Sequence, residues 1–305
     1  MHRPVSYIEV EDPGQRIDNF LFKTLKSVPK TRIYRMLRRG EVRVNGSRVK
    51  PAYRLQEGDR VRVPPVRTSV SPPPPRPSND LTATLEAAVL FEDENLLAID
   101  KPSGLAVHGG SGIRLGAIEA LRSARPGQFL ELAHRLDRDT SGCLLLAKSR
   151  SGLQELHAIL RERRAKKTYD LLVFGGWPKK VATVQLKLHR YVAGNGERRV
   201  RVAAHGKLAR TDFRIESAHG SVTWLKARLH TGRTHQIRVH AAASGHPLLG
   251  EEKYATEASA ELSNAMSVDR LCLHATSLVL PWCGEKLRIE APVPELFADV
   301  WARLH

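Results

Sequence analysis

The sequence has 305 residues, a length that suits two domains, and 41% of the residues are hydrophobic. A net charge of +17, with a pI near 10.2, predicts a polyanionic partner such as nucleic acid. No apolar run approaches the ~18 residues of a membrane span, and the first residues lack the apolar core of a secretory signal. Three cysteines without a C-x-x-C pair argue against a disulfide framework. We therefore expect a cytoplasmic protein with no membrane contact.

Basic residues concentrate in residues 1–67, which hold 16 Lys and Arg but only 7 Asp and Glu. Apolar spacing predicts a helix around residues 17–25 and a second over 31–39, ended by Gly40. Residues 42–44 and 60–63 alternate as strands, and Asn45-Gly46 predicts a hairpin turn between them. The second helix is rich in arginine and poor in acidic partners, so we expect it to bind nucleic-acid phosphates rather than to be a merely solvated face, through Arg32, Arg35, Arg38 and Arg39.

Proline marks the end of this region, because residues 63–77 contain 7 of the 18 prolines. Proline fixes φ and lacks an amide donor, which favours an extended, semi-rigid spacer. We therefore predict a small RNA-binding domain over residues 1–67, a linker over 68–80 and a second domain over 81–305.

The second domain mixes strand and helix patterns. Helices are expected at 151–163, where Ser151-x-x-Gln154 resembles a capping box, and at 234–244. Strands are expected at 88–100, 142–147, 167–174, 181–189, 198–202, 209–217 and 222–229. Several strands follow one another without a helix between them, which predicts an α+β fold with a largely antiparallel mixed sheet flanked by helices.

Two polar clusters interrupt the apolar patterns of this domain. In residues 133–147, Asp137 and Asp139 lie on a turn directly before an apolar strand, where a catalytic carboxylate or a structural Arg–Asp turn fits equally well. The spacing does not say which aspartate would react. In residues 229–240, Arg233, Arg238 and two histidines precede or begin a helix, which suits an anion site or a basic RNA-facing surface.

Motifs for other chemistries are missing from the sequence. His235 and His240 are five positions apart, which does not give two metal ligands on one helix face, and there is no zinc-deaminase signature. Ser141 is not in a G-x-S-x-G elbow, and Gly109–Gly112 forms neither a dinucleotide nor a P-loop motif. We expect no metal and no cofactor.

Residues 134–142, His-Arg-Leu-Asp-Arg-Asp-Thr-Ser-Gly, resemble the signature of the RluA family of pseudouridine synthases. Further family motifs follow the family's order at 101–104, 167–169, 231–240 and 246–250. Residues 16–63 resemble the S4 RNA-binding domain. At 250–255 this chain reads Gly-Glu-Glu-Lys-Tyr-Ala, where the family usually has Gly-Asp-x-x-Tyr-Gly.

The resemblance implies the roles of individual residues. It implies that Asp137 is the catalytic carboxylate, that Arg238 pairs with it, and that Tyr169 and Leu273 pack on the two faces of the uracil. Arg135 would fill the gap left when the target base leaves its helix. We also expect His134 and Arg233 to contact the substrate. Since pseudouridine formation is an isomerisation, no redox group is required.

An S4 domain in front of a synthase domain favours specific uridines of bacterial large-subunit (23S) ribosomal RNA as the substrate. We expect a monomeric enzyme that modifies them during ribosome assembly. A synthase that acts on transfer RNA has the same catalytic residues. A non-catalytic assembly factor on a degenerate synthase fold would lack Asp137, Tyr169 or Arg238, and all three are present.

Overall fold

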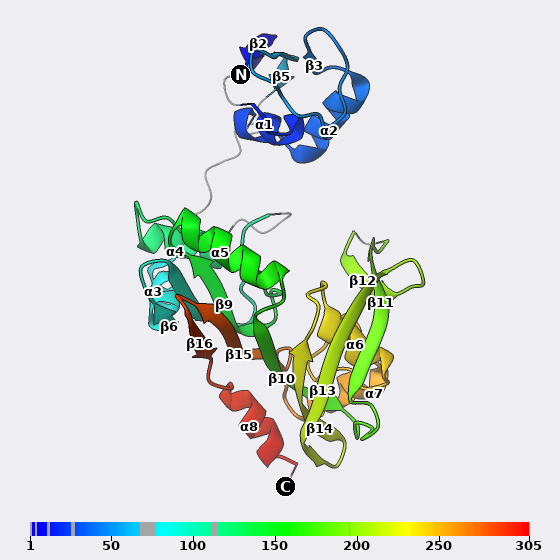
Figure 1. The fold of residues 1–305 in the computed structure, drawn as a ribbon. Helices are drawn as coiled ribbons and strands as arrows, with labels where there is room; N and C mark the ends of the chain where they lie inside the picture. Colours follow the sequence, from blue (N-terminus) through cyan, green and yellow to red (C-terminus); the bar gives the residue numbers. More distant parts are fainter. Residues whose placement is uncertain are drawn as a thin grey trace. The chain divides into compact units, whose positions relative to one another are not determined.

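The computed structural model describes residues 2–3, 5–10, 13–25, 28–67, 77–110, 115–194 and 196–304. The chain divides into two compact units, Met1–Pro74 and Pro75–His305, and each is described here by itself (Figure 1). Most of the predicted linker, residues 68–76, lies outside the described residues. Its last two residues begin a helix, α3 (Asn79–Ala87), which Ser78 caps by accepting a hydrogen bond from the Leu81 amide.

The first unit packs two helices against small sheets. Both helices predicted from apolar spacing are confirmed, and Gly40, with φ of 68°, ends the second in the left-handed region that glycine adopts freely. Buried Ile17, Leu21, Ile33 and Met36 hold the two helices against the strands. The elements are β1 (His2–Arg3), β2 (Ser6–Glu9), α1 (Ile17–Thr24), α2 (Lys30–Arg39), β3 (Arg43–Val44), β4 (Arg60–Val63) and β5 (Val66–Arg67).

The predicted hairpin in this unit is only half correct. Asn45 and Gly46 both have positive φ, as the tight turn requires, but the turn leads back only to Ser47. The partner of β3 is β4, which starts more than a dozen residues later and also pairs with β2, a strand that the sequence analysis missed. The result is a three-stranded sheet in the order β2-β4-β3.

The second unit is built on an 11-stranded sheet in the order β12-β11-β13-β14-β10-β15-β9-β7-β6, with β16 on β15 and β8 on β9. All its strand pairs are antiparallel except β9 with β15, which confirms the predicted α+β class. The strands are β6 (Val89–Glu92), β7 (Leu96–Lys101), β8 (Glu131–Leu132), β9 (Ser141–Ala147), β10 (Lys166–Phe174), β11 (Thr183–Val192), β12 (Arg198–Val202), β13 (Lys207–His219), β14 (Val222–Leu229), β15 (Leu273–Trp282) and β16 (Glu285–Glu290).

Helices flank this sheet, and β10 lies between the half that carries α3, α4 and α5 and the half formed by β11–β14 with α6 and α7 (Figure 1). The sequence pattern did not predict α3, α4, α7, α8, β8, β15 and β16. The remaining helices are α4 (Ala117–Ala124), α5 (Arg150–Arg161), α6 (Gln236–Ala243), α7 (Glu257–Ala265) and α8 (Glu295–Ala302).

Three local predictions in this unit are wrong. The single strand expected at 88–100 is a hairpin, because the Asp93 carboxylate accepts the amides of Asn95 and Leu96 at 2.7 Å and turns the chain there. Helix α5 is capped by Ser149, not Ser151. Helix α6 begins at Gln236, since His235 adopts a left-handed conformation.

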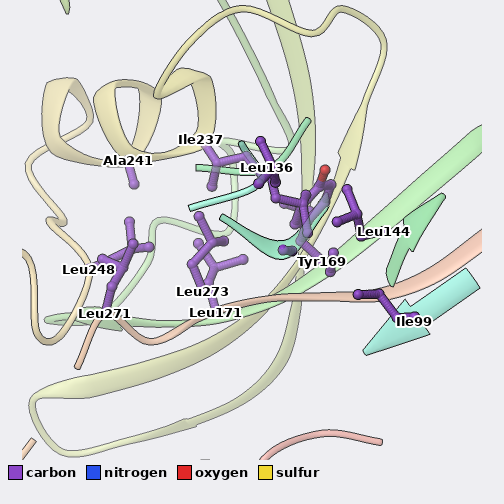
Figure 2. Packing of buried hydrophobic residues seen from close by; sticks show 14 of the residues in the cluster. Ile99, Leu136, Leu144, Tyr169, Leu171, Ile237, Ala241, Leu248, Leu271 and Leu273 are labelled. Atoms are coloured by element: carbon purple, nitrogen blue, oxygen red, sulfur yellow. The ribbon is translucent and has the colours of Figure 1, made fainter. Parts of the chain in front are cut away.

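The central strands hold the site rigidly. Every residue of β9 is buried, and its first residues run parallel to the start of β15, with Ser141 opposite His274. Gly142 has φ of 108°, and a Cβ there would lie 2.4 Å from the carbonyl oxygen of Ala275. Apolar side chains from several elements pack into one cluster around these strands, including Leu136, Tyr169, Ile237 and Leu273 (Figure 2).

Candidate active site

A cavity of about 510 Å³ lies where the loop before β9 meets the starts of β10 and α6. Six residues selected from the sequence line it, although they come from four separate parts of the chain. These are Arg135, Asp137, Tyr169, Arg233, Arg238 and Leu273. The fold therefore brings most of the predicted catalytic-domain site together.

The geometry distinguishes the two aspartates that the sequence left open. Asp137 lines the cavity with a side chain that is 20% exposed. Asp139 is absent from the lining; its carboxylate pairs with Arg138 at 2.9 Å, and its carbonyl accepts the Ser103 hydroxyl. Of the two carboxylates, only that of Asp137 therefore faces the cavity.

Lys101 holds the loop that carries Asp137. Its fully buried ammonium donates to the carbonyl oxygens of Pro102, Leu105 and Arg138 at 2.6, 2.8 and 3.0 Å. Three acceptors match the three N–H donors of a lysine. Burial lowers the pKa of Lys101 to about 7, and Asp139 is the largest charge acting in the opposite direction.

Tyr169 and Leu273 provide an apolar slot beside Asp137. They lie on neighbouring strands, β10 and β15, and are 7% and 3% exposed. Burial raises the pKa of Tyr169, and the negative charge of Asp137 adds to this, so the side chain is a neutral phenol. A planar aromatic surface with an apolar neighbour suits the stacking of a nucleobase.

Arg238 differs from its expected pairing. Its Nε and Nη2 donate to the two carboxylate oxygens of Glu251 at 2.7 and 2.5 Å, and both side chains are almost fully buried. Its expected ion pair with Asp137 is not among the salt bridges of the described residues. Burial lowers the pKa of Arg238, but Glu251 and, less strongly, Asp137 raise it by more.

His134 is also placed differently from the expectation that it contacts substrate. Its Nε2 accepts the backbone amide of Leu145 on β9 at 3.1 Å, and the residue is not part of the cavity lining. Burial, followed by the charge of Lys167, holds its pKa well below the ordinary value. His134 therefore braces the signature loop against the sheet.

A cluster of basic residues that the sequence pattern did not single out as a site lines part of the cavity and is called here the basic rim. Its five cationic residues are mostly exposed, and the run of basic residues from 161 to 167 was its signal in the sequence. Lys167 lies deeper, and burial lowers its pKa to about 8. The rim consists of Arg161, Arg163, Arg164, Lys166 and Arg228.

The four arginines predicted to bind phosphates lie on α2 of the first unit. Arg35, Arg38 and Arg39 are exposed, whereas Arg32 is half-buried and pairs with Glu41 at 2.8 Å. Three of the four predicted phosphate-binding arginines are therefore free of an acidic partner within the described part of the chain.

Among the described residues, no three His, Cys, Asp or Glu side chains come together as ligands for a metal ion. Of the helices that the structure describes, none is long and apolar enough to cross a bilayer.

Comparison with known proteins identifies the family of the chain. The family profile described as RNA pseudouridylate synthase matches residues 95–243, and that of the S4 domain matches residues 15–61. Ribosomal large subunit pseudouridine synthase C of Pasteurella multocida (strain Pm70) is 50% identical over 294 residues, covering 95% of this chain and 90% of the relative. The chain belongs to the RNA pseudouridine synthases.

Other relatives of this chain belong to the same family. Ribosomal large subunit pseudouridine synthase C of Escherichia coli (strain K12) is 48% identical, over 94% of this chain and 92% of the relative. The solved structure of human RNA pseudouridylate synthase domain containing 4 is 25% identical and has a TM-score of 0.62 over 74% of this chain and 96% of that one. A pseudouridine synthase is an isomerase. Because residues of the family motifs line the cavity, the cavity is the candidate active site.

Proposed function

We propose that this synthase converts specific uridines of large-subunit (23S) ribosomal RNA to pseudouridine, with Asp137 as its catalytic carboxylate. The reaction breaks the N1–C1′ bond, turns the uracil and rejoins it through C5. An ionised carboxylate beside the sugar is required, whether it attacks covalently or removes a proton. The observation that carries the proposal is that Asp137, Tyr169 and Arg238 line one cavity with a basic rim.

The other cavity residues have complementary roles in this proposal. Tyr169 and Leu273 hold the uracil between them, and Tyr169 is close enough to Asp137 for the carboxylate charge to raise its pKa. Arg238, fixed by Glu251, keeps positive charge near the carboxylate. Exposed Arg135 on the signature loop occupies the space that the flipped base leaves, and Arg233 contacts a flanking phosphate.

The first unit supplies further RNA affinity in this proposal. Residues 1–67 form an S4-type RNA-binding domain, residues 68–80 the tether and residues 81–305 the catalytic domain. Arg35, Arg38 and Arg39 contact phosphates, which fits shape-based recognition of folded RNA. The enzyme acts as a monomer, in the cytoplasm, on ribosomal RNA during assembly, and neither a metal nor a cofactor enters the reaction.

Pseudouridine mapping in a strain that lacks the gene tests the substrate. We expect sites in 23S ribosomal RNA to lose pseudouridine and to regain it with the wild-type gene but not with Asp137→Asn. Restoration in transfer RNA and not in ribosomal RNA would contradict the substrate assignment. Restoration by both genes would contradict the role of Asp137.

A further inference from the structure

His235 has an unusual backbone conformation at the edge of the active site. It is the residue before α6, with φ of 51° and ψ of 24°. This left-handed region costs a residue other than glycine roughly 1 kcal/mol, and histidine visits it more often than most. The conformation places the imidazole in the cavity lining, with the side chain only 11% exposed.

One ring nitrogen of His235 is held by Tyr254. The distance between His235 Nδ1 and the Tyr254 hydroxyl oxygen is 2.6 Å. That oxygen already accepts the backbone amide of Val200 at 3.0 Å, so its own proton is available for Nδ1. Burial raises the pKa of Tyr254 to about 12, which keeps the proton on the phenol.

These contacts favour one tautomer of the ring. A neutral imidazole has one donor and one acceptor nitrogen. A phenol that already accepts from Val200 has its own proton to donate to Nδ1, which places the proton of the neutral ring on Nε2. Burial lowers the pKa of His235 by more than the charge of Asp137 raises it, so the ring is neutral at neutral pH.

The protonated nitrogen faces the catalytic carboxylate. His235 Nε2 is 4.0 Å from Asp137 Oδ2, about 1 Å longer than a hydrogen bond. Catalytic contacts are often long without substrate and shorten when it binds. Other charged groups that act on His235 are Arg238 on its own helix and Glu251 and Lys253 on the segment after it.

We propose that His235 is a positioning residue, whose Nε2–H donates to Asp137 Oδ2 when RNA fills the cavity, with Tyr254 fixing the tautomer that makes this possible. The neutral donor orients the carboxylate and stabilises its ionised form, while Oδ1 stays free to react with the uridine. The proposal rests on the catalytic role of Asp137 proposed above.

The test compares His235→Ala, His235→Gln and Tyr254→Phe in the full-length protein, with His157→Gln, on an exposed position of α5, as the matched control. Tritium release from C5-labelled ribosomal RNA gives kcat and KM. A hydrogen bond to a charged group predicts that His235→Ala lowers kcat roughly 10- to 100-fold, with KM changed less than about twofold. The acidic limb of its kcat/KM profile moves to higher pH, because a carboxylate without its donor is protonated more readily.

His235→Gln retains an amide N–H near the position of Nε2 and recovers most of the lost kcat. Tyr254→Phe lowers kcat less than His235→Ala, because it removes the hydrogen bond that favours the Nε2–H tautomer but keeps the imidazole ring. If melting temperatures show that His235→Ala does not fold, the other two variants carry the test. The control keeps wild-type kinetics.

Two results would overturn the proposal: wild-type kcat and pH profile in His235→Ala, or equal loss in folded His235→Gln and His235→Ala. The assay of Asp137→Asn separates this outcome from failure of the catalytic assignment. An inactive Asp137→Asn with a fully active His235→Ala would contradict only the positioning role. An active Asp137→Asn would contradict both.

Discussion

Arg238 and Glu251 form a buried ion pair at the active site. Removing two charges from water costs several kcal/mol each, and only good geometry with further hydrogen bonds offsets this. The pair meets that condition with two parallel N–H···O bonds, and Glu251 also accepts the backbone amide of Lys253 at 2.8 Å. Glu251 thereby holds the guanidinium at the cavity wall, and Arg238 also lies over the ring of Tyr254.

This part of the site could not be read from the sequence. The resemblance to the family implied Asp137 and Arg238, because each lies in a family motif that is continuous in the sequence. Glu251 lies 13 positions after Arg238, in a segment that departs from the family pattern, and only the fold shows that they meet. The contact of Tyr254 with His235 was hidden for the same reason.

Lys167 makes RNA binding depend on pH. Burial lowers its pKa to about 8, so the cavity loses a positive charge as the pH rises through 8. The pKa of Tyr169 is raised and that of His235 is lowered, so neither titrates in this range. Lys101, with a pKa of about 7, does titrate, but it does not line the cavity. We expect KM for RNA to rise about three- to tenfold between pH 7 and 9, as the loss of one phosphate contact predicts.

Arginine at this position remains charged at pH 9, so Lys167→Arg should show a flat KM over the same range. An equal rise in wild type and variant would contradict this account. The effect of charged Lys167 on the stability of the fold is opposite in sign to that of a lysine in an ion pair. Because the folded pKa lies below the unfolded value, burying the charged lysine costs stability below pH 8, and the cost disappears as the pH rises towards 10.

At the scale of elements, the junction of β9 and β15 sets the active-site geometry. Asp137 precedes β9 and Leu273 begins β15, and the two strands run parallel at Ser141–Gly142. The backbones approach so closely at Gly142 that a Cβ would lie 2.4 Å from one backbone atom of Ala275 and 2.6 Å from another. Glycine is therefore required here for both space and conformation.

Gly142→Ala should reduce the free energy of unfolding by about 2–4 kcal/mol, through the clash and the strained φ together. Gly127→Ala is the matched control, because Gly127 also has positive φ, 81°, but has no atom within 4 Å of an added Cβ. It should cost only about 1 kcal/mol. Urea unfolding measures both, and equal losses would show that packing at the junction is unimportant.

Strands with clear alternation or a short unbroken apolar run were predictable, and elements with neither were not. β12 and β14 have the predicted bounds, and β9 and β10 start one residue earlier. β15 carries His and Thr on one face and Ser and Pro on the other, so its sequence does not alternate between apolar and polar residues. The helix α7, rich in Ser and Ala, has little apolar contrast between its faces.

At the scale of the molecule, positive charge is spread over both units. The net charge of +17 predicts binding that weakens steeply with salt. Exposed Arg35, Arg38 and Arg39 on α2 have no acidic partner in the described part of the chain, whereas Arg32 pairs with Glu41. The sequence analysis treated the four arginines alike, and only the structure separates them.

Replacing Arg35, Arg38 and Arg39 together by Gln should raise KM and reduce the slope of log affinity against log salt by about 2–3, since each phosphate contact contributes roughly 1. Arg32→Gln should change the slope less, because Glu41 already neutralises that charge. Filter binding over a salt series measures the slope for both variants. An unchanged slope in the triple variant would contradict phosphate binding by α2.

The most direct test of the central claim, catalysis by Asp137, is tritium release from C5-labelled uridine in unmodified 23S ribosomal RNA. Wild type, Asp137→Asn and Asp139→Asn are compared, with RNA binding measured in parallel. We predict release by wild type and by Asp139→Asn, whose carboxylate lies outside the cavity lining, and none by Asp137→Asn, with binding intact in all three. Substantial release by Asp137→Asn would contradict the account.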